Sequence, residues 1–273
     1  MNALRDYSDT SFELVRRAVR NTIGYRSPAY QLGSNLLTSL EVMRREGYST
    51  WKRLRSLSTG RSSPVEVVSL RSLKYPIHVR PGTDDAITVT NNVIREEYGH
   101  GLVHQSPRFM IDAGAFIGDT TAYFLSRFPN LHVTAIEPNV ENFTLARTNL
   151  APYGDRVNLL NQALGGRAGE VHFAGHSTAG SVQKDGEPIS MTTVPILLST
   201  IPGSKVDILK LDIEGEEFAV LGEDASEWLP QVGQIIVEIH GADIESHIFA
   251  VLKKNGFNLK QYRSVWVCTN ASW

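Results

Sequence analysis

A glycine-containing segment flanked by carboxylates is the first part of the chain whose residue types could bind a ligand. It reads DAGAFIGDTT, with Gly114 and Gly118 between Asp112 and Asp119. It follows the apolar run 109–111 and precedes a helix-like stretch, the context in which a glycine loop binds a nucleotide-like ligand. A diphosphate requires a bare, positive helix N-terminus. The two acids oppose a diphosphate and favour a cationic ligand.

A second acidic position, Glu137, is followed by Pro138 at the end of the next strand-like run, 131–136. A carboxylate there can accept two hydrogen bonds from a ribose diol. A loop that disfavours phosphate and a carboxylate that binds ribose together predict a nucleoside ligand without phosphates. S-adenosylmethionine (SAM), with its adenosine, sulfonium cation and amino acid, meets that description. For Asp112 and Glu137 taken singly, a helix-capping or ordinary surface role stays open.

The elements that must position these residues alternate between strand-like and helix-like segments from residue 65 onward. Strands are expected at 109–111, 131–136, 157–164, 208–211 and 235–239, and the first helices at 119–128 and 139–149. This order predicts a parallel sheet with helices on both faces. The runs 257–262 and 264–269 lie too close together for a crossover helix, so they predict an antiparallel hairpin.

The segment VDILKLDIEGEEFAVL at 206–221, taken with DAGAFIGDTT, IEPN, NQALG and VEIHG, resembles the FkbM family of SAM-dependent methyltransferases. The resemblance covers about residues 76–269, and its most specific part is the K-x-D-x-E-G-x-E pattern that begins at Lys210. It implies an α/β, Rossmann-like class I methyltransferase fold, with a mostly parallel seven-stranded sheet ending in an antiparallel hairpin. It also implies methyl transfer to a hydroxyl, commonly on sugars or polyketide-type molecules.

The resemblance also implies a cofactor site. From the methionine part of SAM through the ribose to the adenine, the residues carried over are Asp112, Gly114, Phe116, Gly118, Asp119, Thr120, Glu137, Pro138, Gln162 and Ala163. Asp212 would lie beside the sulfur at the carboxyl end of the fourth strand, where ligands bind in open α/β sheets. At Phe116 the chain departs from similar sequences, which more often carry a polar residue, typically Asn.

His240, in VEIHG at the end of the fifth expected strand, is the first candidate for a general base. An attacking alcohol loses its proton, and a positioned base accelerates such a step by about 10²–10⁴-fold. A histidine with its ordinary pKa of about 6.5 suits that task at neutral pH. Asp212 is the second candidate, as base or as the group that orients the hydroxyl. A strand-end histidine that caps backbone is the alternative role for His240.

Substrate contacts are expected from two further regions and from Glu214. His176 and Ser177 lie in a hydroxyl-rich loop that could bind sugar hydroxyls, although flexible loops share this composition. Upstream residues would close over the site, and the candidates are Arg80, Asp84 and Tyr98. Arg80 and Asp84 could equally form a surface ion pair, and an acid such as Glu214 in a helix's first turn is also stabilised by the helix dipole.

A metal site is the less favoured alternative. The hard ligands available at the strand ends are Asp212, Glu214, Glu238 and His240. They show no close-spaced ligand motif such as HExxH.

The N-terminal part differs from the rest in charge. Residues 1–75 carry 13 Lys and Arg against 6 Asp and Glu, although the chain's formal net charge is −2. Apolar residues at helical spacing predict two helices, one over Phe12 to Ile23 and one that ends near Gly47, with a loop at 56–64. We therefore divide the chain into a basic helical extension, 1–63, which acts as a lid or oligomerisation arm, and a methyltransferase domain, 64–273. Binding of a membrane surface by the extension is the less favoured alternative.

Composition excludes several classes of protein. The near-neutral charge argues against a nucleic-acid binder. The single cysteine, Cys268, excludes an internal disulfide and a multi-cysteine zinc site, and indicates a reducing compartment. The sequence has neither a spanning apolar run nor a signal-peptide core, so a cytoplasmic protein is expected. A homo-oligomer stays open.

Two other functions compete with O-methyl transfer. An NAD-linked oxidoreductase would use a similar sheet, but the glycine spacing is GxxxG rather than GxGxxG, and acids surround the loop. A non-catalytic SAM-binding scaffold would retain the glycine loop without turnover. A comparison of SAM binding with NAD binding distinguishes the methyltransferase from the oxidoreductase. Methyl transfer to an acceptor distinguishes it from the scaffold.

Overall fold

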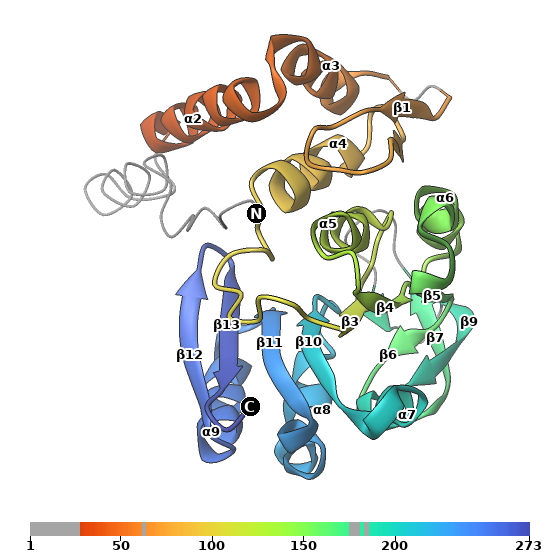
Figure 1. Cartoon of the computed structure of the whole chain (residues 1–273), viewed down its shortest axis with the longest axis vertical. Coiled ribbons are helices and arrows are strands. Elements are labelled where there is room, and N and C mark those ends of the chain that lie inside the picture. Colours follow the sequence, from red (N-terminus) through yellow and green to blue (C-terminus); the bar gives the residue numbers. More distant parts are fainter. Residues whose placement is uncertain (1–27, 62–63, 175–180, 183–185) are drawn as a thin grey trace.

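The computed structural model describes residues 28–61, 64–174, 181–182 and 186–273 (Figure 1). The predicted helix over Phe12 to Ile23 and the candidates His176 and Ser177 lie outside these residues. No helix in the described ranges is long and apolar enough to cross a membrane.

A seven-stranded sheet of order β12-β13-β11-β10-β3-β4-β5 forms the centre of the molecule (Figure 1). Its strands are β3 (Phe109–Ala113), β4 (His132–Ile136), β5 (Val157–Leu160), β10 (Val206–Leu211), β11 (Val232–Glu238), β12 (Phe257–Tyr262) and β13 (Val265–Asn270). Five strands are parallel, and β13 runs antiparallel to both β11 and β12. This is the strand arrangement of class I methyltransferases, and the predicted parallel sheet with a C-terminal hairpin is confirmed.

Alternate strand residues build two cores, one on each face of the sheet. In β3, Met110 faces a core shared with α5 (Asp119–Arg127) and α6 (Val140–Leu150). Its neighbour Ile111 faces the opposite core, whose helices are α7 (Val194–Thr200), α8 (Glu217–Leu221) and α9 (Ala242–Lys254). Each parallel strand is therefore buried on both faces, which explains the nearly continuous apolar runs in the sequence.

The predicted strand 157–164 is wrong beyond Leu160. There β5 ends, and the side-chain amide of Asn161 donates to the backbone oxygens of Glu137 and Pro138, at 2.8 and 3.0 Å. The chain turns and enters a second sheet of order β6-β9-β7-β8. Its strands are β6 (Ala163–Leu164), β7 (Gly169–Ala174), β8 (Ser181–Val182) and β9 (Glu187–Thr192).

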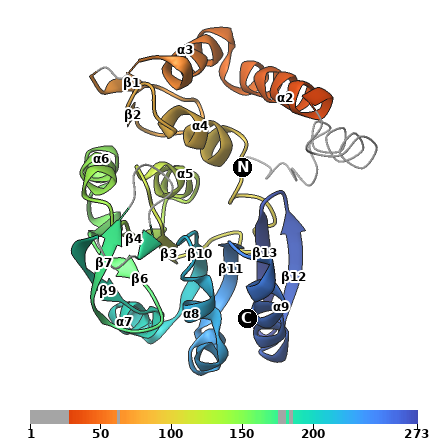
Figure 2. The ribbon, with the colours of Figure 1, turned by 180° about the vertical axis from the view of Figure 1, so that it is seen from behind.

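Two N-terminal helices, α2 (Pro28–Glu46) and α3 (Tyr48–Thr59), meet at Gly47, where φ is +94°. The predicted loop 56–64 is wrong for residues 56–59, which complete α3 because Leu54 and Leu57 bury one face of that helix. Both leucines belong to the core of α5 and α6. The helices α2, α3 and α4 (Asp85–Val89) lie as a further layer on the side of the sheet that α5 and α6 cover (Figure 2).

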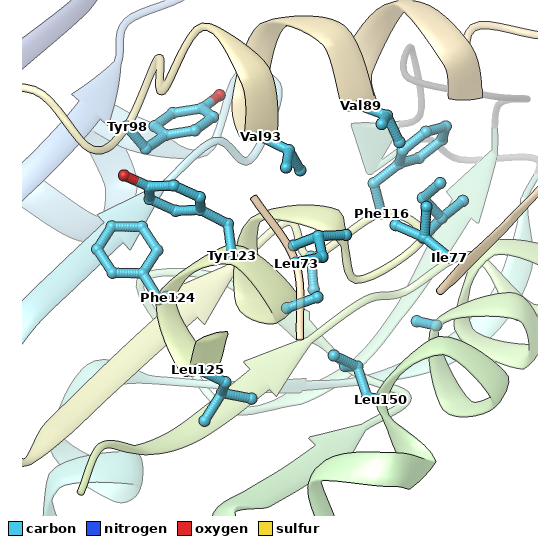
Figure 3. Close-up of a cluster of buried hydrophobic side chains, with 14 of the residues drawn as sticks. Leu73, Ile77, Val89, Val93, Tyr98, Phe116, Tyr123, Phe124, Leu125 and Leu150 are labelled. Atoms are coloured by element: carbon cyan, nitrogen blue, oxygen red, sulfur yellow. The ribbon is translucent and has the colours of Figure 1, made fainter. Parts of the chain in front are cut away.

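Short elements link the N-terminal layer to β3, and they are β1 (Glu66–Val68), β2 (Ile77–Val79) and the π-helix η1 (Thr90–Ile94). Four 3₁₀ turns, η2 (Ala151–Arg156), η3 (Pro202–Ser204), η4 (Glu223–Glu227) and η5 (Leu229–Gln231), precede β5, β10 and β11. Val89, from α4, lies beside the buried ring of Phe116, and Val93, from η1, belongs to the same buried cluster (Figure 3). The α4–η1 segment thereby packs directly on the glycine loop.

Candidate functional site

A cavity opens where β3, β4 and β10 end, at the carboxyl edge of the sheet. It measures about 800 Å³ when the solvent at its mouth is included. The cofactor and substrate candidates that line it are Gly114, Phe116, Asp119, Thr120, Glu137, Pro138, Ala163, Asp212 and Glu214. Asp112, Gly118, Gln162, Arg80, Asp84, Tyr98 and His240 are not among its lining residues. The cavity therefore joins three of the segments that the sequence singled out.

Both glycines of the loop adopt a left-handed backbone. Gly114 has φ +78°, and a Cβ there would collide with the carbonyl oxygen of Asp212. Gly118 has φ +81°, and a Cβ there would lie 2.9 Å from Cγ of Leu150. These glycines are thus required so that β10 and α6 can approach the loop, a packing constraint that the sequence does not reveal.

Asp112 lies below the cavity and is fully buried. Its Oδ2 accepts a hydrogen bond from the hydroxyl of Thr121, and its Oδ1 lies 3.3 Å from Nζ of Lys210. The lysine lines the cavity, where Nζ donates to the backbone oxygen of Gly114 at 2.6 Å. Burial lowers the pKa of Lys210, but Asp112 and Asp212 outweigh it, so the pKa is raised. Asp112 therefore acts on the cavity through a charged lysine.

Asp119 begins α5 and is 1% exposed. Its Oδ2 accepts a hydrogen bond of 3.0 Å from the side-chain amide of Asn92, in η1. Its Oδ1 has no hydrogen-bond partner among the described residues, and the side chain lines the cavity. Burial raises the pKa of Asp119 to about 7, although Asn92 and Lys210 oppose the shift. A buried acceptor without a partner is costly, so this oxygen is suited to a cationic donor in the cavity.

Glu137 is 5% exposed and ties the glycine loop to β4. Its Oε2 accepts the backbone N–H of Phe116 at 2.8 Å, and its Oε1 accepts that of Asn139 at 2.9 Å. Burial raises the pKa of Glu137 to about 7 against these bonds. Phe116 has a φ of +50°, and its ring lies 5.6 Å from the guanidinium carbon of Arg80. The loop therefore holds an unusual backbone that Glu137 stabilises.

The suggested pairing of Arg80 with Asp84 is wrong. Arg80 makes a bidentate contact with the neighbouring Asp85, with Nε–Oδ2 at 2.9 Å and a terminal nitrogen 2.8 Å from Oδ1. Asp85 is fully buried in the first turn of α4, whereas Asp84 precedes the helix and is half-buried. Arg80 also donates to Asn142, at 2.8 Å, and Asn142 lines the cavity. The arginine supports the wall of the cavity from outside.

Tyr98 brings together the ends of β10 and β11. Its hydroxyl donates to Oδ2 of Asp212 at 2.8 Å and lies 3.5 Å from a carboxylate oxygen of Glu238. Burial, then the charges of Asp212 and Glu238, raise the pKa of Tyr98. Asp212, Glu238 and His240 each offer one ligand atom, and these atoms lie within 4.8 Å of one another. Within the described part of the chain, these three residues are the set that could share a metal ion.

His240 follows β11 and lies between two carboxylates. Its Nδ1 is 2.6 Å from Oε1 of the buried Glu217, and its Nε2 is 3.7 Å from Oε1 of Glu214. The bond to Glu217 raises the pKa of His240 to about 9, against burial, which lowers it. The expectation of an ordinary pKa near neutrality is therefore wrong, because the sequence does not show which carboxylates face the ring.

Several residues of this site were missed as functional candidates, among them Glu217, Thr88 and Asn92. Glu217 belongs to the K-x-D-x-E-G-x-E pattern, and that signal could have drawn attention to its side chain. Thr88 and Asn92 line the cavity from α4 and η1. No motif marks them, because only the packing of the N-terminal layer brings them to the glycine loop.

Comparison with known proteins gives one family. The family model "Methyltransferase FkbM domain" matches residues 112–259, more than half of the chain. Methyltransferase sdnD of Sordaria araneosa is 27% identical over 58% of this chain and 76% of that protein. Ribosomal RNA small subunit methyltransferase H of Nocardia farcinica is 32% identical, but over only 26% of this chain and 22% of that protein.

Solved structures with a similar arrangement include a precorrin-6y C5,15-methyltransferase from Geobacter metallireducens. It is 16% identical, covers 67% of this chain and 84% of its own, and has a TM-score of 0.39. A putative caffeoyl-CoA O-methyltransferase from Staphylococcus aureus is 13% identical, covers 85% and 97%, and has a TM-score of 0.40. The fold assignment rests on the strand order described above.

Proposed function

Because the chain belongs to the FkbM methyltransferase domain family, we propose that this methyltransferase uses SAM and methylates a hydroxyl of a small molecule. The acceptor class that we propose is a sugar, a glycoconjugate or a polyketide-type compound. The proposal depends on the environment of Asp119, which lines the cavity. Its Oδ1 is buried and has no hydrogen-bond partner among the described residues. It matches a ligand that carries a positive charge.

The rest of the cavity supports a phosphate-free nucleoside. Four acids line it, Asp119, Glu137, Glu214 and Glu216, in addition to Asp212. Among the described lining residues, Lys210 is the one basic side chain, and its Nζ already contacts Asp112 and the backbone of the loop. A diphosphate would meet net negative charge here.

An apolar part of the wall suits a purine ring. It is formed by Ala163, Leu164 and Phe173 from the second sheet, with Ile136 and Pro138 at the end of β4. Aromatic and aliphatic side chains bury a flat ring well, and a few polar groups then fix its orientation. The carboxylate of Glu137 lies between this apolar part and the glycine loop, a position consistent with a ribose contact.

SAM, when bound, supplies a methyl group already activated on a sulfonium centre. The protein must align an acceptor oxygen with that methyl group, which can contribute several kcal/mol to the rate, up to about 7–11 in ideal cases. Asp212 lies at the cavity and bonds Tyr98, so it can orient an acceptor hydroxyl. His240 can accept the proton, but with its pKa of about 9 it must first lose its own.

The proposal is tested by two measurements. Titration calorimetry with SAM and with NAD should give binding of SAM alone; binding of NAD alone favours the oxidoreductase. A screen of sugars, glycans, polyketides and an RNA control with methyl-labelled SAM should then place the label on an oxygen of a small molecule. SAM binding without transfer to any acceptor favours the scaffold, and label in the RNA contradicts the acceptor class.

A further inference from the structure

We propose that Glu217 is the positioning residue of a Glu217–His240 pair, in which the buried carboxylate holds the proton on Nδ1 and presents Nε2 to the acceptor hydroxyl. This inference rests on the proposed methyl transfer to oxygen with His240 as base. It assigns a role to a residue of the family pattern through its contacts in this chain.

Glu217 is held in place through both of its carboxylate oxygens. The side chain is fully buried at the start of α8. One oxygen lies 2.6 Å from Nδ1 of His240, and the other accepts the backbone N–H of Gly215 at 3.1 Å. Because a carboxylate only accepts hydrogen bonds, Nδ1 must carry the proton. With both oxygens engaged, the carboxylate fixes the plane and the tautomer of the imidazole.

A left-handed turn after β10 places Glu217 at this position. After β10 the chain passes through Glu214, with φ +30°, and Gly215, with φ +90°. This left-handed turn directs Glu217 back between the ends of β10 and β11, while Phe218 remains 46% exposed. A non-glycine residue at positive φ costs about 1–3 kcal/mol and is typical of functional sites.

Nε2 is the ring nitrogen of His240 that Glu217 does not contact. Its nearest charged neighbour is Glu214, at 3.7 Å, which exceeds hydrogen-bond distance. Glu214 is 37% exposed at its side chain and lines the cavity together with Asp212. His240 itself is not a lining residue, so Nε2 reaches the cavity past Glu214, a neighbour that an acceptor hydroxyl can displace.

The pair would assist methyl transfer by accepting the proton of the acceptor hydroxyl. The acceptor oxygen forms a bond to the methyl carbon while the carbon–sulfur bond breaks, and that electron pair goes to sulfur. The acceptor O–H bond breaks, and its proton moves to Nε2. Glu217 then faces an imidazolium, which its negative charge stabilises, as the third member of a catalytic triad does.

The pair also sets the pH dependence. The charged groups that face His240 are Glu217 from α8, Glu214 and Asp212 from the end of β10, and Glu238 from β11. They keep the imidazole protonated until about pH 9. The rate should therefore rise with pH up to about 9 in the wild type. In Glu217→Gln, which lacks this negative charge, the same increase in rate should occur at lower pH.

The decisive measurement needs no acceptor. Nitrogen-15 histidine spectra of the SAM-loaded protein, with the His240 signal identified by its loss in His240→Gln, report tautomer and pKa directly. The expected result is an Nδ1–H tautomer after deprotonation in the wild type. In Glu217→Gln we expect a mixture of tautomers and a lower pKa of His240, because the hydrogen bond to Glu217 is the largest cause that raises it. An Nε2–H tautomer in the wild type overturns the proposal, even if the variant fails to fold.

Kinetics separate this inference from the proposed function. With an identified acceptor, Glu217→Gln should lower kcat by about 10-fold to 10⁴-fold, the upper value being that of a neutralised triad carboxylate. KM for SAM should stay within about twofold. The control Glu223→Gln, at an exposed acid of η4, should match the wild type. If His240→Gln is inactive and Glu217→Gln is fully active, the pair is refuted; if His240→Gln is active, the base in the proposed function is refuted.

Discussion

At the scale of single residues, the cavity is defined by acids whose charge depends on what they face. Asp119 and Glu137 are both almost fully buried, and burial raises the pKa of each to about 7. Glu137 already receives two backbone N–H groups, whereas one oxygen of Asp119 receives none from the described residues. Asp119 therefore has the most to gain from a cationic ligand.

Replacing Asp119 by asparagine should weaken SAM binding about 10–100-fold, because one hydrogen bond to a charged group contributes about 1.5–3 kcal/mol. Calorimetry at pH 8 measures the change. Asp224→Asn, at an exposed acid of η4, is the control and should bind SAM like the wild type. An unchanged dissociation constant in Asp119→Asn would exclude this carboxylate from the ligand site.

The affinity for SAM should rise between pH 6 and pH 8. Below about pH 7 the two buried carboxyls are mostly protonated, and above it they are ionised and attract a cation. Because both pKa values are raised in the folded state, their contribution to stability is largest at low pH and is lost as the pH rises through about 7. SAM should therefore raise Tm more at pH 8 than at pH 6, and Asp119→Asn should reduce that difference. A pH-independent shift would contradict the assignment.

The residue types could be predicted from the sequence better than their partners. The acids around the glycine loop and at the strand ends are visible in the motifs. The contacts of these side chains are not visible there. Asn92 bonds to Asp119, and Glu217 bonds to His240, only because elements distant in the chain pack together. For the same reason the sequence suggested Asp84 for Arg80, although the neighbouring carboxylate of Asp85 is the buried one.

At the scale of elements, the glycine loop is constrained by its neighbours. Gly114 and Gly203 have nearly the same φ, +78° and +75°, but a Cβ meets the carbonyl oxygen of Asp212 at Gly114 and nothing within 4 Å at Gly203. The two glycines thus separate the cost of the backbone conformation from the cost of a collision.

Gly203→Ala should destabilise the protein by about 1–2 kcal/mol, the cost of a left-handed residue. Gly114→Ala should cost that amount plus the displacement of β10, and it should also weaken SAM binding. Denaturant unfolding measures the first effect and calorimetry the second. Equal losses of stability in the two variants would contradict this expectation. They would show that the loop and β10 move apart to accommodate the Cβ without a loss of folding free energy.

Elements with a regular period were predicted well, and elements that end on a side-chain contact were not. The parallel strands follow from apolar runs buried on both faces. The end of β5 depends on the side-chain amide of Asn161, which donates to the backbone of the two residues that follow β4. The end of α3 depends on the burial of Leu54 and Leu57. Neither contact has a local signature in the sequence.

At the scale of the whole molecule, the N-terminal layer and the sheet share one hydrophobic core, which includes Leu57 of α3. Leu57→Ala should destabilise the chain by about 2–5 kcal/mol, as for other buried leucines. Leu36→Ala on α2, where the side chain is 60% exposed, should change stability by less than about 0.5 kcal/mol.

Both variants should unfold in a single transition by calorimetry, because the layer and the sheet are packed on the same residues. If Leu57→Ala lowers only one of two resolved transitions, the N-terminal helices fold as a separate unit.

The cavity wall formed by Thr88 and Asn92 lies upstream of residues 112–259, the region that the family model matches. The shared motifs and this part of the wall can therefore diverge at different rates. A relative can keep the glycine loop and the K-x-D-x-E-G-x-E pattern but carry another sequence before them. Its cavity would then differ in shape at the positions of Thr88 and Asn92 and keep the same wall elsewhere. A change at Thr88 would alter the shape of the cavity alone, whereas a change at Asn92 would also remove the hydrogen bond to Oδ2 of Asp119.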